Sequence, residues 1–359
     1  MPDITATHTA RQTVQAQLPA THPMQQQGEA FAPSNIALCK YWGKRDKVLN
    51  LPVNPSLSIS LAELGSRTRL SQLDASTDQV HLNGELLGAD SAFATKVVQF
   101  IDLFRQPGES RLLIETHNNI PTAAGLASSA SGFAALTLAV DRLYDFNLSP
   151  QQLSAFARLG SGSASRSIFE GFVEWQMGVR EDGMDSHAVQ LEQQWPEFRV
   201  GLLTLTSAEK AVGSRAGMQR TVETAHLYQS WPLQAATDLE RLRNAIAEQN
   251  FTSLGATAEQ NALSMHATMI ASWPPLLYWQ PESVAAMQRI WMLREQGLEL
   301  YFTMDAGPNI KLLFLERDLA DVVAAFPQLQ VVAPFGTSVA PETDPTTDPA
   351  TDPSMATID

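Results

Sequence analysis

The most constraining feature of the sequence is Pro121–Val140, PTAAGLASSASGFAALTLAV, where a loop of small residues runs directly into a helical pattern. From Leu126 onward, apolar and small side chains recur every three or four positions, for example at Ala130, Phe133 and Thr137, which predicts a helix. Backbone N–H groups of a Gly/Ala/Ser loop can approach an anion closely, and the positive end of the helix faces the same point. The pattern therefore favours a phosphate site, although the close packing of a helix start calls for the same small residues.

The rest of the chain interleaves strand and helix patterns irregularly, which predicts the α+β class. Apolar residues alternate with Ser and Ala over Ser56–Leu64, as in a strand. Ser149 and Pro150 have the positions of an N-cap and a first helical residue, so a helix is expected to end near Gly160. Further helices are predicted over residues 235–249, 251–272 and 283–296, and strands are predicted on both sides of a turn at 305–309.

Charge and composition limit the classes of function. The formal net charge of −14 disfavours non-specific binding to nucleic acid. No apolar run is long enough to span a bilayer and the N-terminus lacks the pattern of a secretory signal, so no membrane partner is expected. Cys39 is the single cysteine, which excludes an internal disulfide and favours a cytoplasmic location. The spacing of the histidines does not match a protein-ligated zinc site.

Both ends of the chain are expected to lie outside the folded unit. Residues 1–28 are rich in Gln, Thr and Ala and are predicted to form a flexible extension. Residues 340–359, APETDPTTDPATDPSMATID, carry five acids and no base, and they repeat Thr-Asp-Pro. Such a segment has almost nothing to bury, so we expect a disordered tail, with a role in partner binding as the alternative.

Two basic segments strengthen the case for an anionic small ligand. The first gathers four cations and a tyrosine within eight residues, at Lys40, Tyr41, Lys44, Arg45 and Lys47. The second, Gly160–Trp175, places Arg166 among four serines in a Gly-rich turn, a combination that suits a carboxylate or a phosphate. The alternatives are a solvated charged face and a flexible linker. Acidic residues are nearly absent from the first segment, and bulky apolar residues directly follow the second, which argues against both alternatives.

Taken in order, these segments resemble a known family. Pro121–Ala130 is similar to the phosphate loop of the GHMP kinase superfamily, Pro-x-x-x-Gly-Leu-x-Ser-Ser-Ala. Four further segments resemble the diphosphomevalonate decarboxylase family: NIALCKYWGKRD, SGSASRSIFEGFVEW, GSRAGMQRTVET and YFTMDAGPN. The resemblance implies a two-lobed GHMP kinase fold with a deep active-site cleft. Residues 29–204 are expected to form a lobe like ribosomal protein S5 domain 2, and residues 205–339 a ferredoxin-like lobe.

The resemblance also implies a reaction. Members of the family convert mevalonate 5-diphosphate to isopentenyl diphosphate, with ATP and Mg²⁺, in the mevalonate pathway of isoprenoid biosynthesis. ATP phosphorylates the tertiary 3-hydroxyl, and loss of that phosphate then draws electrons from the neighbouring carboxylate, which leaves as CO₂. ADP and phosphate are the other products. A homodimer is expected by analogy with the family.

The same resemblance assigns roles to individual residues. Asp305 is implied to face the substrate 3-hydroxyl as a general base or orienting group, whereas the stretch alone favours a turn-capping aspartate. Lys40 is implied to pair with this aspartate, and Ser214 to lie near the same hydroxyl. Arg166 and Asn35 are implied to lie beside the substrate carboxylate, which completes the predicted catalytic set.

The remaining predicted contacts involve phosphates. Diphosphate contacts are implied for Tyr41, Lys44, Ser161, Ser163, Arg166 and Arg215. The nucleotide phosphates are implied to meet Gly125, Leu126, Ala127, Ser128, Ser129 and Ser131, with Ser129 as the candidate Mg²⁺ ligand.

Two other functions compete with this prediction. A related enzyme could act on mevalonate or its 5-phosphate, as a 3-kinase or a monophosphate decarboxylase. The presence of both Asp305 and Lys40 favours decarboxylation, and the cations that include Lys44 and Arg215 favour a diphosphate. A non-catalytic metabolite-binding protein of the same fold is the second alternative, and the intact phosphate loop and Asp305 argue against it.

Overall fold

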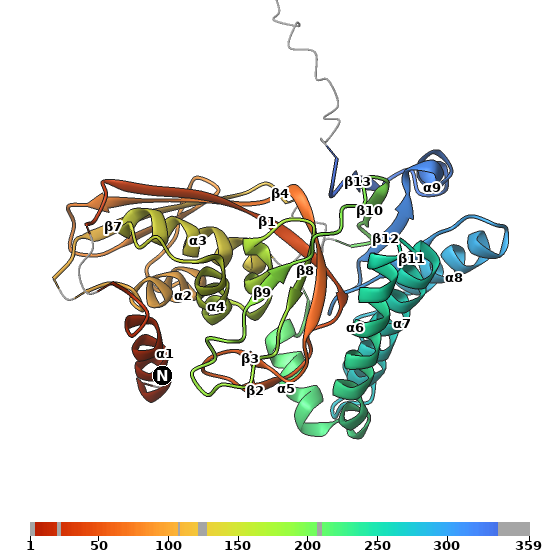
Figure 1. The fold of residues 1–359 in the computed structure, drawn as a ribbon, viewed down its shortest axis with the longest axis horizontal. Coiled ribbons are helices and arrows are strands. Elements are labelled where there is room, and N and C mark those ends of the chain that lie inside the picture. The colour runs from red at the N-terminus through yellow and green to blue at the C-terminus, as the bar shows by residue number, and fades with distance from the viewer. Residues whose placement is uncertain (1–3, 20–22, 107, 121–127, 207–209, 337–359) are drawn as a thin grey trace, which may run out of the picture.

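The computed structural model describes residues 4–19, 23–106, 108–120, 128–206 and 210–336. It has two lobes, each built on its own sheet with helices packed against it, and they lie side by side along the long axis (Figure 1). The predicted α+β class is confirmed. Within the described ranges, no helix is long and apolar enough to cross a membrane. The acidic tail predicted at 340–359 lies outside the described residues.

The first lobe is organised around one long strand, β4 (Ser56–Leu73). β1 (Gln27–Cys39) pairs antiparallel with β4 over most of its length. On the other edge of β4, β8 (Phe172–Trp175) pairs with its first part and β7 (Arg111–Asn118) with its second part. The sheet is completed by β5 (Gln79–Leu82), β6 (Glu85–Leu86) and β9 (Ala188–Gln190), in the order β6-β5-β7-β4-β8-β9.

Three helices cover one face of this sheet: α2 (Ala92–Ile101), α3 (Ser128–Tyr144) and α4 (Pro150–Gly160) (Figure 1). The small residues of α3 let it lie very close to β1. A Cβ atom on Gly28 would come within 2.3 Å of the Ala139 carbonyl oxygen, so only glycine fits at this position of the strand. The helix predicted after the phosphate loop is confirmed, while Pro121–Ala127 itself lies outside the described residues.

Helix α4 begins as its sequence predicts. The Ser149 side chain accepts a hydrogen bond from the Gln152 backbone N–H, and the Gln152 side chain accepts one from the Ser149 N–H at 3.0 Å. This reciprocal capping box satisfies two N–H groups that a helix start otherwise leaves free. Helix α4 ends at Gly160, directly before η2 (Gly162–Ile168), the serine-rich turn that carries Arg166.

The N-terminal segment differs from the predicted flexible extension. It contains a helix, α1 (Ile4–Gln15), and Val14 on this helix is fully buried. Gln15 Nε2 donates to the Leu103 carbonyl at 2.8 Å, and Arg11 donates to the Arg105 carbonyl at 2.7 Å. These carbonyls follow the end of α2, where the helix provides no partner for them. The prediction failed because the sequence of this helix, ITATHTARQTVQ, has few large apolar side chains and no clear helical stripe.

The second lobe has a four-stranded antiparallel sheet in the order β11-β12-β10-β13. Its strands are β10 (Phe198–Leu203), β11 (Tyr301–Thr303), β12 (Ile310–Leu315) and β13 (Gln330–Val332). Between β10 and β11 the chain forms α5 (Ser214–Thr224), η3 (His226–Ser230), α6 (Trp231–Ala247), α7 (Phe251–Ile270) and α8 (Pro281–Glu295). After β12, η4 (Glu316–Asp318) and α9 (Leu319–Ala325) lead to β13. The three predicted helices and the strand–turn–strand are confirmed, although α6 begins earlier, with Pro232 in its first turn.

A continuous apolar core joins the lobes. Leu57 and Ile59 of β4 belong to the same buried cluster as Leu239 of α6 and Leu254 of α7. Ser58, between the two apolar strand residues, is also fully buried, so this part of β4 is covered on both faces. The end of β1 and the hairpin of β2 (Lys44–Asp46) and β3 (Leu51–Pro52) therefore lie where the lobes meet.

Candidate active site

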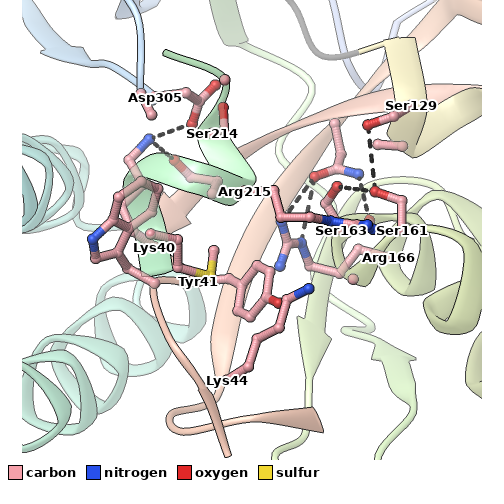
Figure 2. A pocket seen from close by; sticks show the side chains of 18 of the residues that line it. Lys40, Tyr41, Lys44, Ser129, Ser161, Ser163, Arg166, Ser214, Arg215 and Asp305 are labelled. Carbon is pink, nitrogen blue, oxygen red and sulfur yellow. Dashed lines mark hydrogen bonds and ion pairs between the residues drawn. The ribbon is translucent and has the colours of Figure 1, made fainter. Parts of the chain in front are cut away.

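A pocket of about 400 Å³ lies between the two lobes. The first lobe contributes the end of β1, the segment after it, α2, the start of α3 and the turn η2, and the second contributes α5, α7 and the turn after β11. Eleven predicted site residues line it: Asn35, Lys40, Tyr41, Lys44, Ser129, Ser161, Ser163, Arg166, Ser214, Arg215 and Asp305. Figure 2 shows most of these side chains arranged around one space. The structure thus brings together residues that are far apart in the sequence.

At one end of the pocket, Asp305 is paired with two lysines. Lys40 Nζ donates to Asp305 Oδ1 at 2.9 Å and to the Ala37 carbonyl at 2.8 Å (Figure 2). Lys311 Nζ lies 3.6 Å from Asp305 Oδ2. Both lysine side chains are only 2% exposed, whereas that of Asp305 is 39% exposed, so the carboxylate is the member of this group that a ligand can reach.

The lysines determine the protonation state of Asp305. Burial raises the pKa of its carboxyl, but the charges of Lys40 and Lys311 outweigh that effect and hold the pKa well below its usual range. The pKa of Lys40 is lowered, because the effect of burial outweighs the opposing charge of Asp305. Lys210, whose Nζ donates to Ser214 Oγ at 3.1 Å, adds a third cation on the same side. Asp305 is therefore an anion at neutral pH and a weak proton acceptor.

Arg166 forms a second polar centre on the first-lobe side. Its Nη2 donates to Asn35 Oδ1 at 3.2 Å and its Nη1 to Ser56 Oγ. Asn35 in turn donates to Ser167 Oγ at 2.8 Å, so the orientation of its amide is set. Burial lowers the pKa of Arg166 to about 10, which still leaves it cationic at neutral pH. A rigid, buried guanidinium with an amide beside it is suited to hold a carboxylate.

Hydroxyl groups and cations form the wider part of the pocket. Ser161 Oγ lies 3.3 Å from Ser129 Oγ and 3.4 Å from Ser163 Oγ, which brings the helix start of α3 and the turn η2 together (Figure 2). The Tyr41 hydroxyl is buried and has no hydrogen-bond partner among the described residues. Arg215, from α5, also lines the pocket. Several hydroxyls and cations around one space are the donors that phosphate oxygens require.

The residues predicted to contact the nucleotide phosphates lie in different places. Ser129 lines the pocket, but Ser131 is fully buried and its Oγ lies 2.8 Å from Ser66 Oγ. The structure thus differs from the prediction at Ser131, because that position on the helix faces the sheet rather than the pocket. Ser128 is exposed and is not among the pocket residues. Gly125, Leu126 and Ala127 lie outside the described residues.

Three lysines of the site were not predicted. Lys311 lies in the otherwise apolar strand IKLLFL, and a lone buried lysine in such a strand was a usable signal. Lys96, on the largely apolar helix α2, lines the pocket with its Nζ 4.5 Å from the centroid of the Phe133 ring. Lys210 directly follows residues 207–209, which lie outside the described ranges, and it had no local signal. All three add positive charge to the region around Asp305 and the hydroxyls.

We expect the affinity for an anionic ligand to fall above pH 8. Burial, together with the charge of Arg215, lowers the pKa of both Lys44 and Lys96 to about 8. An ammonium group is charged below its pKa and neutral above it, so a rise in pH through this value removes positive charge from the pocket. The measurement is kcat/KM from about pH 6 to 10, compared with Lys44→Arg, which stays charged in this range. A wild-type profile that is flat to pH 10, or identical in the variant, would contradict the assignment.

Comparison with known proteins agrees with this geometry. Residues 32–188 match the diphosphomevalonate decarboxylase-like N-terminal domain, and residues 201–349 match the mevalonate 5-diphosphate decarboxylase C-terminal domain. The chain belongs to the diphosphomevalonate decarboxylase family. The first match begins at residue 32, after α1.

Individual relatives cover most of the chain. The diphosphomevalonate decarboxylase of Gibberella zeae is 39% identical over 330 residues, which is 86% of each chain. The Saccharomyces cerevisiae decarboxylase is 38% identical and covers 82% of this chain and 79% of its own. Among solved structures, the Staphylococcus aureus mevalonate diphosphate decarboxylase is 38% identical with a TM-score of 0.81, covering 86% of this chain and 95% of its own. A structure described as MDDEF in complex with MVAPP, AMPPCP and magnesium is 39% identical, with a TM-score of 0.80, over 86% of this chain and 96% of its own.

Proposed function

We propose that this chain is an ATP-dependent decarboxylase that converts mevalonate 5-diphosphate to isopentenyl diphosphate, ADP, phosphate and CO₂. The observation that carries the proposal is the combination of an anionic Asp305, paired with Lys40, and a buried Arg166 fork in one pocket. Family membership supports the same reaction.

The substrate carboxylate is proposed to bind Arg166 and Asn35. The guanidinium is already held by Ser56 and Asn35, so little rotational freedom is lost when a carboxylate binds. The diphosphate end is proposed to meet Tyr41, Lys44, Ser161 and Ser163 on the first lobe, and Arg215 on the second lobe. The unpartnered Tyr41 hydroxyl supports this placement, because a buried polar group without a partner is costly unless a ligand satisfies it.

Asp305 is proposed to accept a hydrogen bond from the substrate 3-hydroxyl and to orient it toward the terminal phosphate of ATP. Its low pKa makes it a poor proton acceptor, and phosphoryl transfer through a loose transition state needs little help from a base. The hydroxyl proton then leaves late, once the new P–O bond has made it acidic, and passes to an oxygen of the transferred phosphoryl group. After transfer, the C3–O bond to phosphate breaks and positive charge develops at C3. A carboxylate beside C3 stabilises that charge, and the electrons of the departing carboxylate then form the double bond. One residue thus serves both steps.

The phosphates of ATP are proposed to lie at the N-terminus of α3, beside Ser129 and Lys96. The described residues include no group of three or more His, Cys, Asp or Glu side chains that could hold a metal ion. This fits Mg²⁺, which keeps several waters and binds mainly through substrate phosphates with one or two protein ligands. Ser129 is the proposed protein ligand, and bound Mg²⁺ would neutralise charge on the transferring phosphoryl group.

The lobes are proposed to be those of the GHMP kinase fold. The boundary is proposed to lie before β10 rather than near residue 204, because β10 (Phe198–Leu203) belongs to the sheet of the second lobe. The order of elements after β10 supports this fold for the second lobe. From β10 onward, the chain forms a strand, helices, two strands, a helix and a last strand. In the sheet, the first of these strands lies between the third and the fourth, which is the ferredoxin-like arrangement. The single long strand β4, paired with three neighbours, organises the first lobe.

The test is a coupled assay with ATP and Mg²⁺ in which mevalonate, its 5-phosphate and its 5-diphosphate are offered separately. We expect equal amounts of ADP and CO₂ from the diphosphate and neither product from the other two. ADP without CO₂ would indicate a 3-kinase instead. Turnover of the monophosphate would reassign the substrate, and binding of the diphosphate without any turnover would indicate a non-catalytic protein.

A further inference from the structure

The backbone of Lys40 is held from two sides by asparagine side chains. Its N–H donates to Asn261 Oδ1 at 2.8 Å, and its carbonyl accepts from Asn54 Nδ2 at 2.9 Å. Asn261 lies in the middle of α7 and is fully buried. Through Asn261, the second lobe thus fixes the backbone of Lys40, the residue whose side chain pairs with Asp305.

A buried carboxylate sets the direction of the Asn261 amide. Asn261 Nδ2 donates to Asp238 Oδ2 at 2.8 Å, and Asp238 on α6 is also fully buried. Gln234 Nε2 donates to the other oxygen, Asp238 Oδ1, at 2.7 Å. An ionised carboxylate only accepts hydrogen bonds, so the amide nitrogen must face Asp238 and the amide oxygen must face Lys40.

The same helix also holds the other member of the pair. Five residues after Asn261, His266 Nε2 donates to the Asp305 carbonyl at 3.0 Å. Burial lowers the pKa of His266 to about 4, so the ring is neutral, and it stacks on Trp279 with ring centroids 5.5 Å apart. Helix α7 therefore contacts the backbone of Lys40 through one side chain and that of Asp305 through another.

We propose that Asn261, oriented by Asp238, is a positioning residue that sets the placement of Lys40 against Asp305 and thereby the rate of the chemical step. The proposal rests on the proposed function, in which Lys40 and Asp305 act at the substrate hydroxyl. The physical reason is that a buried amide has one orientation when its oxygen and its nitrogen both form hydrogen bonds. Water or an apolar side chain in its place would leave the Lys40 peptide free to shift. A displacement of about 1 Å in a reacting group can reduce the rate by ~10²-fold.

A purely structural role would have a different signature. If Asn261 only satisfied a buried N–H group, its loss would lower stability, and activity below the melting temperature would remain normal. Positioning predicts a fall in kcat with nearly unchanged KM values, because Asn261 lines no part of the pocket. The split between kcat and KM therefore separates the two roles.

The experiment compares Asn261→Ala, Asp238→Asn, Asn261→Asp and the exchange Asp238→Asn/Asn261→Asp in the full chain. Each single change should lower kcat, by up to ~10²-fold. Asp238→Asn lets the Asn261 amide pair with position 238 in either direction, so its oxygen is no longer fixed toward Lys40, and Asn261→Asp places two carboxylates face to face. The exchange should recover most of the turnover. In it, the new amide at position 238 would donate to the new carboxylate at position 261, and that carboxylate would still accept from the Lys40 N–H.

Two neighbours on α7 serve as controls. Gln260 is exposed and its amide contacts Ser264, so Gln260→Ala should leave both kcat and the melting temperature unchanged. Leu254 is fully buried, about two turns before Asn261, so Leu254→Ala should lower the melting temperature and leave kcat unchanged. Circular dichroism reports whether each variant folds. If Asn261→Ala does not fold, Asp238→Asn, which keeps the side-chain volume, still tests the proposal.

The proposal is overturned if folded Asn261→Ala and Asp238→Asn both keep the wild-type kcat. It is also overturned if kcat falls in proportion to the melting temperature in every variant, Leu254→Ala included, or if the folded exchange variant is no faster than the single ones. Failure of the proposed function is distinct, because then the wild-type chain itself releases no ADP and CO₂ from mevalonate 5-diphosphate.

Discussion

Asp305→Asn is expected to lower kcat by roughly 10²–10⁴-fold while mevalonate 5-diphosphate still binds. Asparagine keeps the shape of the side chain and can still accept a hydrogen bond, but it loses the charge. Without that charge, positive charge at C3 is not stabilised, and the ammonium group of Lys40, 2.9 Å away, has no anionic partner. Both effects oppose the step in which CO₂ leaves.

The measurement is kcat from the ADP and CO₂ assay, with substrate affinity by calorimetry. Asp321→Asn is the matched control, because Asp321 lies exposed on α9 in the same lobe. The low pKa of Asp305 adds a second expectation. A carboxylate is charged above its pKa, so wild-type kcat should show no loss from protonation of Asp305 until the pH falls well below the usual aspartate range. Near-normal turnover of Asp305→Asn would remove the residue from the mechanism.

Arg166→Lys is the second change with a large expected effect, a fall of about 10–100-fold in kcat/KM. The guanidinium reaches Ser56 and Asn35 and still faces the pocket, whereas one ammonium group cannot serve all three directions. Loss of one charge-assisted hydrogen bond to the substrate costs about 1.5–3 kcal/mol, which corresponds to a fall of about 10–100-fold in kcat/KM. Asn35 Oδ1 would also lose its donor.

The matched control is Arg243→Lys. Arg243 forms a similar two-point fork, at 2.7 and 2.6 Å, with the Glu174 carboxylate, and it is not among the pocket residues. Arg243→Lys should therefore change stability without changing kcat/KM. If Arg166→Lys retains wild-type kcat/KM, or if both variants lose activity equally, Arg166 does not hold the substrate.

Much of the site could be predicted because its residues lie in short segments with distinctive local chemistry. The cations after β1, the serines around Arg166 and the turn at Asp305 each stood out in an acidic chain. The N-cap of α4 and the helix after the phosphate loop could also be predicted, because such features depend on residues within a few positions of one another.

Other features depend on contacts between distant segments and had little local signal. Helix α1 is stabilised by carbonyl groups at the end of α2, about 90 residues away, so its own weakly apolar sequence suggested an extension. Ser131 could not be separated from Ser129 by sequence, because only the packing of α3 on the sheet decides which hydroxyl faces the pocket.

The sequence by itself determined which groups are available: one carboxylate in a turn, a basic cluster, a guanidinium among serines and a helix start with small residues. Only the tertiary structure decided how they work together. Lys40 and Asp305 are 265 positions apart, and they meet because the two lobes share one core and α7 contacts both backbones. The low pKa of Asp305 follows from that meeting, since charges interact through space and their strength depends on distance and burial, neither of which a linear sequence contains.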